Sequence, residues 1–332
     1  MGQLAFLDSY PGAYIVQSFL HSAVAAAVVE IAFRVWEFRN PALRQRFLLI
    51  AVAFPVFSFP LFQVINPERL SLTFRMGALL DSGRWLYLDP WGIAPLVVIG
   101  LLLIFLVTTL VFLFQEFLPV VRHTFEKRPS GKTAGRSGAD DPDVQRVVGT
   151  LPGNRPELFV LEEEEIVLFS TTGKSGAVYV SEGLLRALPP EEVQAAVAHE
   201  YAHVLRGRRP VLLVLFLLRA VMFFNPVTLL QFRRIVQEDE KICDDFAAEL
   251  TGRPAALAEA LRRLYLAGGE KRPGTGKTLM EEMEALESYS HRLHIESRVE
   301  RLEKEVPSAA DGGGLATVLT VAAILLTTYF VV

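Results

Sequence analysis

His199, Glu200 and His203 form an H-E-x-x-H pattern within Val197–Val204. Residues four apart lie on one face of a helix, so both imidazoles can point at a single metal ion. Glu200 is then placed to reach a water on that metal, which is the arrangement of a zinc-dependent hydrolase. The alternative is an ordinary amphipathic helix that carries two polar histidines.

The residues before this pattern favour the metal site. Leu188–Val193 has prolines at a helix entry and acidic residues in the first turn, which together predict a helix start. Val193–Ala198 is small or apolar, as a buried helix requires. The sequence therefore predicts a buried helix that presents two histidines and a glutamate.

A third ligand is expected because a catalytic zinc keeps three protein ligands and one open position. The acidic run Gln237–Phe246 lies downstream, and within it only Glu240 has an aspartate four residues on, Asp244. One residue of this pair can bind the metal while the other hydrogen-bonds a ligating imidazole. The alternative is a solvated acidic helix face. Cys243, between them, is interpreted as a small buried core residue rather than a ligand.

Composition indicates a membrane protein. The 332 residues are 51% hydrophobic, with a mean hydropathy of +0.33. The net charge of −4 gives no reason to expect nucleic-acid binding. Cys243 is the single cysteine, so no intrachain disulfide can form.

Four apolar runs are long enough to be considered spans: about 13–35, 47–65, 95–117 and 315–332. Pro55 and Pro60 interrupt the second run. His21 and Glu30 in the first are interpreted as interhelical contacts, with a functional role as the alternative. We therefore predict three transmembrane helices within residues 1–121 and a C-terminal transmembrane helix within 312–332.

Basic residues orient these spans. They cluster at Arg34–Arg46 and again at Arg122–Arg136, and both clusters should be cytoplasmic. Trp85, Tyr87 and Trp91 are interpreted as an aromatic belt at the membrane interface. The prediction is a multi-pass protein of the inner (cytoplasmic) membrane, with both termini outside and the intervening domain in the cytoplasm.

The cytoplasmic part is predicted to be a linker at 122–156 followed by a domain at 157–311. Short strands are expected at 158–161, 166–169 and 177–180, with a solvated turn of four glutamates at 162–165. The fold class is thus an α-helical membrane protein with a cytoplasmic α+β domain, mostly helical with about three strands. The apolar stretch 211–232 is interpreted as a re-entrant or membrane-associated helical hairpin turning at Phe224–Pro226, because a single crossing would separate Glu240 from the histidines. Arg219 within it should face protein or head groups.

Taken together, His199-Glu-x-x-His203, Phe224-Asn-Pro226 and Glu240-x-x-Cys-Asp244 resemble the membrane gluzincins of the BlaR/MecR antirepressor type. Val178–His203 and Glu296–Leu302 are similar to the HtpX-like and CAAX prenyl endopeptidases. The resemblance covers about residues 157–302. It implies a zincin domain in which one Zn2+ is held by His199, His203 and Glu240, with Glu200 as base and Asp244 behind the ligands.

The resemblance also implies roles outside the ligand set. Arg298 matches the arginine of the family's late motif and is a candidate, with a nearby histidine, for stabilising the oxyanion. HtpX-like proteins often have a His-Pro pair shortly before that arginine, and this chain has none; His291 or His294 is the substitute, and both are the next candidates for a ligand. The related endopeptidases pair extended substrate with an edge strand, which here implies substrate binding at Ala177, Val178, Tyr179 and Val180.

The expected function is therefore that of an integral membrane zinc metalloendopeptidase in which Glu200 activates a zinc-bound water. Its partners would be protein or peptide substrates, among them membrane proteins or a repressor, and the lipid bilayer. One alternative is an antirepressor-type signalling protease that cleaves a transcriptional repressor or itself. A second is a non-catalytic scaffold with a structural metal, which the presence of Glu200 disfavours.

Overall fold

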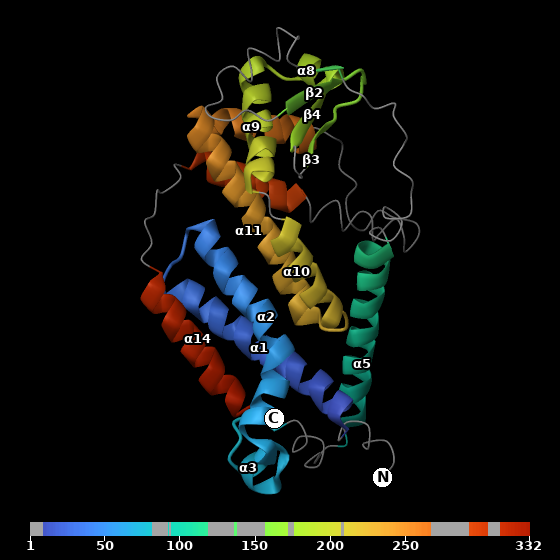
Figure 1. The fold of residues 1–332 in the computed structure, drawn as a ribbon, viewed down its shortest axis with the longest axis vertical. Coiled ribbons are helices and arrows are strands. Elements are labelled where there is room, and N and C mark those ends of the chain that lie inside the picture. The colour runs from blue at the N-terminus through green and yellow to red at the C-terminus, as the bar shows by residue number, and fades with distance from the viewer. Residues whose placement is uncertain are drawn as a thin grey trace. The chain divides into compact units, whose positions relative to one another are not determined.

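The computed structural model describes residues 9–81, 92, 94–118, 136–137, 157–171, 176–206, 209–266, 292–304 and 313–332. Figure 1 shows its helices and its small sheet. The chain divides into two compact units. The first comprises residues 1–127, 212–238 and 309–332, and the second comprises residues 128–211 and 239–308. The predicted aromatic belt at Trp85, Tyr87 and Trp91 lies outside the described residues, as does most of the predicted linker.

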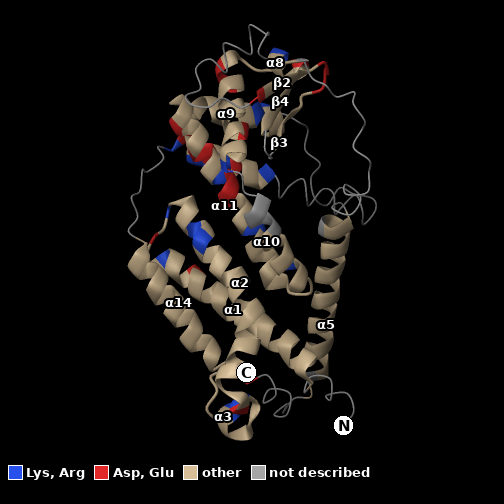
Figure 2. Cartoon of the chain, in the orientation of Figure 1, with Lys and Arg blue, Asp and Glu red and all other residues tan. Residues whose placement is uncertain are grey.

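The first unit contains helices long and apolar enough to cross a membrane: Tyr10–Val35, Pro41–Ile65 and Pro95–Gln115. The first two are α1 (Tyr10–Val35) and α2 (Pro41–Ile65), and the third includes most of α5 (Ala94–Val111). α14 (Gly314–Tyr329) is apolar and shorter. In Figure 2, α5 and α14 carry no charged segment. Pro55 and Pro60 lie inside α2, which stays helical through both.

Short elements complete the connection that follows α2. These are η1 (Pro67–Leu70) and α3 (Leu72–Met76). Arg69 in η1 is fully buried, and its guanidinium donates to the backbone carbonyls of Thr328 and Tyr329 and to Gln17. Buried charge is tolerated only with such partners, so Arg69 fixes the end of α14 against α1.

Polar residues within the spans make contacts between helices, as the sequence predicted for the first span. His21 Nδ1 lies 2.7 Å from Ser58 Oγ, joining α1 to α2. Glu30 accepts from Arg234 at 3.0 Å. Both contacts lie inside the first unit, so these side chains have structural partners.

The stretch predicted as a hairpin consists of two helices. α10 (Arg209–Val221) ends at a turn over residues 222–225, and α11 (Pro226–Thr251) follows. Asn225 begins α11 by accepting from the amides of Val227 and Thr228, and Pro226 supplies a backbone angle suited to the first helical turn. Arg219 is fully buried, so its side chain faces protein rather than head groups. Entry of this hairpin into the membrane stays a prediction.

The second unit holds a sheet in the order β1-β2-β4-β3. Its strands are β1 (Arg136–Ser137), β2 (Glu157–Leu161), β3 (Leu168–Thr171) and β4 (Ala177–Ser181). β2 pairs with β4 in parallel, while β3 pairs with β4 and β1 with β2 antiparallel. The three predicted strands are confirmed, and β1 is a fourth. With the apolar helices, they confirm the predicted fold class.

Four helices of the second unit share one hydrophobic core with this sheet. They are α8 (Glu182–Ala187), α9 (Pro190–Arg206), α12 (Pro254–Leu261) and a helix over residues 292–303. Val178 and Val180 point into the core with Val193 and Val197 of α9. α9 begins at the predicted proline, and its small residues from 195 to 198 are all buried. Small side chains let α9 pack closely on β3 and β4, which fixes its outer face.

Candidate metal centre

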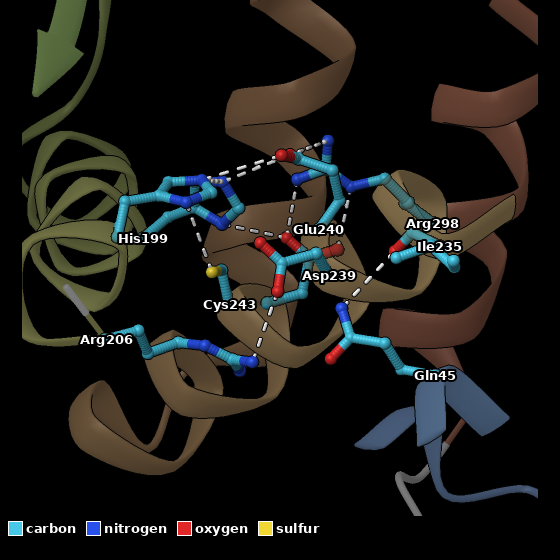
Figure 3. Close-up of polar contacts among 10 residues, drawn as sticks. Gln45, His199, Arg206, Ile235, Asp239, Glu240, Cys243 and Arg298 are labelled. Carbon is cyan, nitrogen blue, oxygen red and sulfur yellow. Dashed lines mark hydrogen bonds and ion pairs between the residues drawn. The ribbon is translucent and has the colours of Figure 1, made fainter. Parts of the chain in front are cut away.

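α9 brings the two histidines together. The rings of His199 and His203 lie 4.9 Å apart between centroids, and their Nε2 atoms are 3.3 Å apart. The His199 side chain is 10% exposed and that of His203 is 26% exposed. Figure 3 shows the His199 ring beside the Glu240 carboxylate. Two nitrogens directed at one point from a buried helix face are the beginning of a metal site.

Glu240 of α11 completes a three-sided donor set. Its Oε2 lies 3.5 Å from His199 Nε2, and its Oε1 lies 3.6 Å from His203 Nε2. Tetrahedral zinc with bonds of about 2.1 Å would separate its ligand atoms by about 3.4 Å. The observed edges of 3.3, 3.5 and 3.6 Å fit that figure. The residues present therefore fit a zinc ion.

Asp244 stands behind the histidine at the predicted place. Its Oδ1 lies 3.0 Å from His199 Nδ1, and the Asp244 side chain is 1% exposed. An Nδ1–H donated to this carboxylate leaves the Nε2 lone pair of His199 for a metal. Because Glu240 and Asp244 are four residues apart on α11, Glu240 lies at Nε2 of His199 and Asp244 lies at Nδ1 of the same ring.

Without a metal ion, a proton on His199 offsets the negative charge of the Asp244 and Glu240 carboxylates. Burial opposes the charged imidazole, but hydrogen bonds to Asp244 and Glu240 raise the pKa of His199 to about 9. Burial likewise opposes the Glu240 carboxylate, and bonding to His199 nevertheless lowers its pKa to about 2. The pKa of Asp244 is lowered against its burial by Arg298 and then by His199. Two carboxylates around a cationic ring form a pocket suited to a divalent cation.

The structure gives Arg298 a different place from the one predicted. Its Nε and Nη2 donate to Asp244 at 2.7 and 2.6 Å, and its Nη1 lies 3.1 Å from Glu240 Oε2. The side chain is 5% exposed. A guanidinium committed to two carboxylates is not directed at a substrate oxyanion, so the predicted oxyanion role is wrong for this geometry. Arg298 instead positions Asp244 and Glu240.

Glu200 follows His199 on α9 and is half-buried. Tyr265, in the short helical segment Arg262–Leu266, carries a phenol whose pKa is raised by burial and then by the Glu200 carboxylate. This tyrosine was not identified from the sequence, where Leu-Tyr-Leu after a short helix gives no signal. His294 belongs to neither potential ligand group among the described residues, and His291 lies outside them.

The strand predicted to bind substrate lies inside the sheet. Ala177, Val178, Tyr179 and Val180 belong to β4, which pairs with β2 on one side and β3 on the other. The prediction that this strand is an edge is therefore wrong, because both of its hydrogen-bonding sides are occupied. β3, which packs on α9, is an edge strand of the described sheet.

Hydrogen-bond alternation shows which backbone groups of β3 face outward. Ser181 donates its amide to the carbonyl of Val167, so these opposite residues form a hydrogen-bonded pair. Bonded and non-bonded pairs alternate in an antiparallel ladder. Phe169 and Thr171 therefore direct their amides and carbonyls at β4, whereas Leu168 and Ser170 direct theirs away from it.

Comparison with known proteins gives a consistent result. Residues 148–265 match peptidase family M48. A protease HtpX homologue of Methanopyrus kandleri is 29% identical over 210 residues, which are 48% of this chain and 66% of that protein. The homologue of Thermodesulfovibrio yellowstonii is 24% identical over 223 residues, 50% of this chain and 76% of that protein. The homologue of Acaryochloris marina is 32% identical over 160 residues, which are 36% of this chain and 53% of that protein.

The match to family M48 contains His199, His203 and Glu240, whose ligand atoms the structure brings together, and it also contains Glu200 and Asp244. The chain spans just under two thirds of the length of the Methanopyrus relative. Residues 148–265 are thus similar to peptidase family M48, and the chain as a whole is similar to the HtpX homologues, as the HtpX-like part of the resemblance predicted.

Proposed function

We propose that this chain is an integral membrane zinc endopeptidase that hydrolyses peptide bonds of protein substrates. The observation that carries the proposal is the set of three ligand atoms from His199, His203 and Glu240, all within 4.8 Å of one another, with Glu200 next to the first histidine. Among the described residues this group offers three donors, which leaves one position of a tetrahedral ion for substrate or water. An open position supports catalysis over a structural metal.

A zinc ion held by these residues would lower the pKa of a water molecule and polarise the scissile carbonyl. The chain's own residues supply the remaining steps. Glu200 accepts a proton from the attacking water and returns it to the leaving amine. Asp244 keeps the proton of His199 on Nδ1, and Arg298 holds Asp244 and Glu240 in place.

We propose that substrate binds in extended form along β3 rather than β4. The outward amides and carbonyls of Leu168 and Ser170 can pair with a peptide backbone, which gives affinity with little sequence preference. β3 packs directly on the helix that carries His199 and His203. A strand added at this edge would therefore run beside the metal site.

The topology inferred from the basic clusters remains part of the proposal. The M48 domain would lie in the cytoplasm, with the termini outside and the protein in the inner membrane. A cytoplasmic site would act on membrane proteins or on soluble proteins such as a repressor. The antirepressor-type role uses the same residues, so it stays an alternative within the same chemistry.

The test is Glu200→Gln in the full-length protein, with zinc content and casein hydrolysis measured together. Because Glu200 is a base and not a ligand, the variant should keep its zinc and lose hydrolysis by about 10²–10⁴-fold. Glu191→Gln is the matched control: Glu191 lies on the same helix and pairs with Arg253 on the surface. Undiminished hydrolysis in the Glu200 variant would refute the mechanism.

A further inference from the structure

α11 carries two pairs of donor residues at i, i+4 spacing, and the second pair is shifted by one residue from the first. Glu240 and Asp244 face His199, as described above. Asp239 and Cys243 lie beside His203, and Cys243 Sγ is 3.5 Å from His203 Nδ1. Donor atoms from His203, Asp239 and Cys243 all lie within 4.8 Å of one another. Cys243 is fully buried and Asp239 is 9% exposed.

We propose that His203, Asp239 and Cys243 form a second metal site, which takes a thiophilic divalent cation such as Zn2+ or Cd2+. Bonds of about 2.1 Å to nitrogen and about 2.3 Å to sulfur would place the two atoms about 3.6 Å apart around a tetrahedral ion. The observed separation is 3.5 Å. A thiolate, an imidazole and a carboxylate are a donor set that soft or borderline cations prefer over Mg2+ or Ca2+.

The two sites compete for one imidazole. His203 Nε2 faces Glu240 and His199, while Nδ1 faces Cys243. A neutral imidazole has one lone pair. A cation at Nδ1 therefore requires the ring proton to move to Nε2, and the Cys243 thiol to release its proton to solvent. His203 is then lost as a ligand to the first site, so occupation of the second site inhibits the enzyme.

Charge makes the second site the weaker one. The Cys243 thiolate and the Asp239 carboxylate together match the charge of a divalent cation. However, Arg206 Nη2 lies 3.2 Å from Asp239 Oδ1, and this guanidinium repels an incoming cation. Figure 3 shows Arg206 directed at Asp239 from the side away from Glu240. The first site fills first. When the metal is in excess, a second ion takes His203 through Nδ1, while the first ion stays on His199 and Glu240 alone, so that two ions are bound and the first has lost a ligand.

The experiment is a cobalt titration of the full-length, metal-free protein in detergent. Cobalt bound to a thiolate gives a near-ultraviolet charge-transfer band, which nitrogen and oxygen ligands do not give. Because Cys243 is the single cysteine, any such band must come from it. We expect the first equivalent of cobalt to bind without this band, and the band to appear with further cobalt. Casein hydrolysis by the zinc enzyme should fall over the corresponding excess of zinc.

Cys243→Ser should bind the first equivalent normally, lack the band and lose inhibition by excess zinc. Asp239→Asn keeps the thiol and should need at least about tenfold more cobalt to develop the band, as expected when a charged ligand is lost. The proposal is overturned if no band appears at any cobalt concentration, if the band appears with the first equivalent, or if excess zinc inhibits the Cys243 variant as before. The inhibition arm rests on the proposed peptidase activity, whereas the band is read without hydrolysis, so the two failures can be told apart.

Discussion

Asp244→Asn should weaken both zinc binding and the fold, because Asp244 serves two buried partners. Its Oδ1 lies 3.0 Å from His199 Nδ1, and it accepts from two nitrogens of Arg298 at 2.6 and 2.7 Å. An asparagine places an NH2 group against one of these donors and leaves Glu240 as the charged partner of Arg298. Zinc affinity should fall by about 10–100-fold, the usual cost of losing a partner behind a metal ligand.

The stability of the metal-free protein should also fall. Breaking a buried ion pair costs about 3–5 kcal/mol, and the lower end applies because Glu240 remains 3.1 Å from Arg298. Asp245→Asn is the matched control, since the next residue on α11 pairs with Arg301 where both side chains are more than a fifth exposed. That surface pair is worth about 0–1 kcal/mol and lies away from the zinc ligands.

The assay combines a chelator competition for zinc with denaturant unfolding of the metal-free protein in detergent. Asp244→Asn should lower both the zinc affinity and the stability to denaturant, whereas Asp245→Asn should change neither by much. Equal zinc affinities for the two variants would refute the reasoning, because they would mean that the contact with His199 Nδ1 does not prepare the metal site. Glu240→Ala, which removes a ligand itself, should reduce zinc occupancy more than Asp244→Asn.

Three further outcomes follow from the structure. Ser170→Pro removes an outward amide at a sheet edge, where proline is tolerated, so the protein should fold while KM rises roughly five- to tenfold, the value of one hydrogen bond of about 1 kcal/mol. Phe169→Pro removes an amide directed at Tyr179, so it should destabilise the fold instead. Equal effects of the two substitutions would contradict the assignment of β3 as an edge strand. The raised pKa of His199 means that its charged form stabilises the metal-free protein fully below about pH 6.5 and that this stability is lost as pH rises through about 9. Zinc binding near pH 7–8 should accordingly release a proton, measured by calorimetry in two buffers of different ionisation enthalpy, and heat independent of the buffer would argue against it. A cysteine introduced at Gly83 should react with an impermeant reagent added outside intact cells, and one introduced at Ser137 should not. Labelling at Ser137 would contradict the predicted orientation.

Local patterns carried most of what the sequence could predict. The two histidines of α9, and Glu240 with Asp244 on α11, repeat at helical spacing, so their shared faces follow from the chain itself. The apolar spans and the strands can be predicted for the same reason, because their patterns lie in consecutive residues. These features need no knowledge of what packs against them.

Features that depend on partners distant in sequence were mistaken or missed. Arg298 was recognised, but the acceptors of its guanidinium depend on how the helix over residues 292–303 packs against α11. The position of β4 between β2 and β3 depends on strand order, which alternation of side chains does not encode. Cys243 was interpreted as core, and it is buried, but its contact with His203 Nδ1 requires the pairing of α9 with α11.

The strand order has a consequence for how the protein is made. β3 leaves the ribosome before β4, yet β4 must enter between β2 and β3 before either of them has its partner on that side. The turn after β2 closes against the start of α8, where Gly183 donates to the Glu163 carbonyl and a Cβ would lie 2.0 Å from the Glu164 carbonyl oxygen. The sheet therefore cannot close until β4 and the start of α8 have been synthesised, and α9 follows at once. A nascent chain halted before β4 would expose an unpaired β3, whereas a chain extended through α9 would gain the sheet and the two histidines in a single late step.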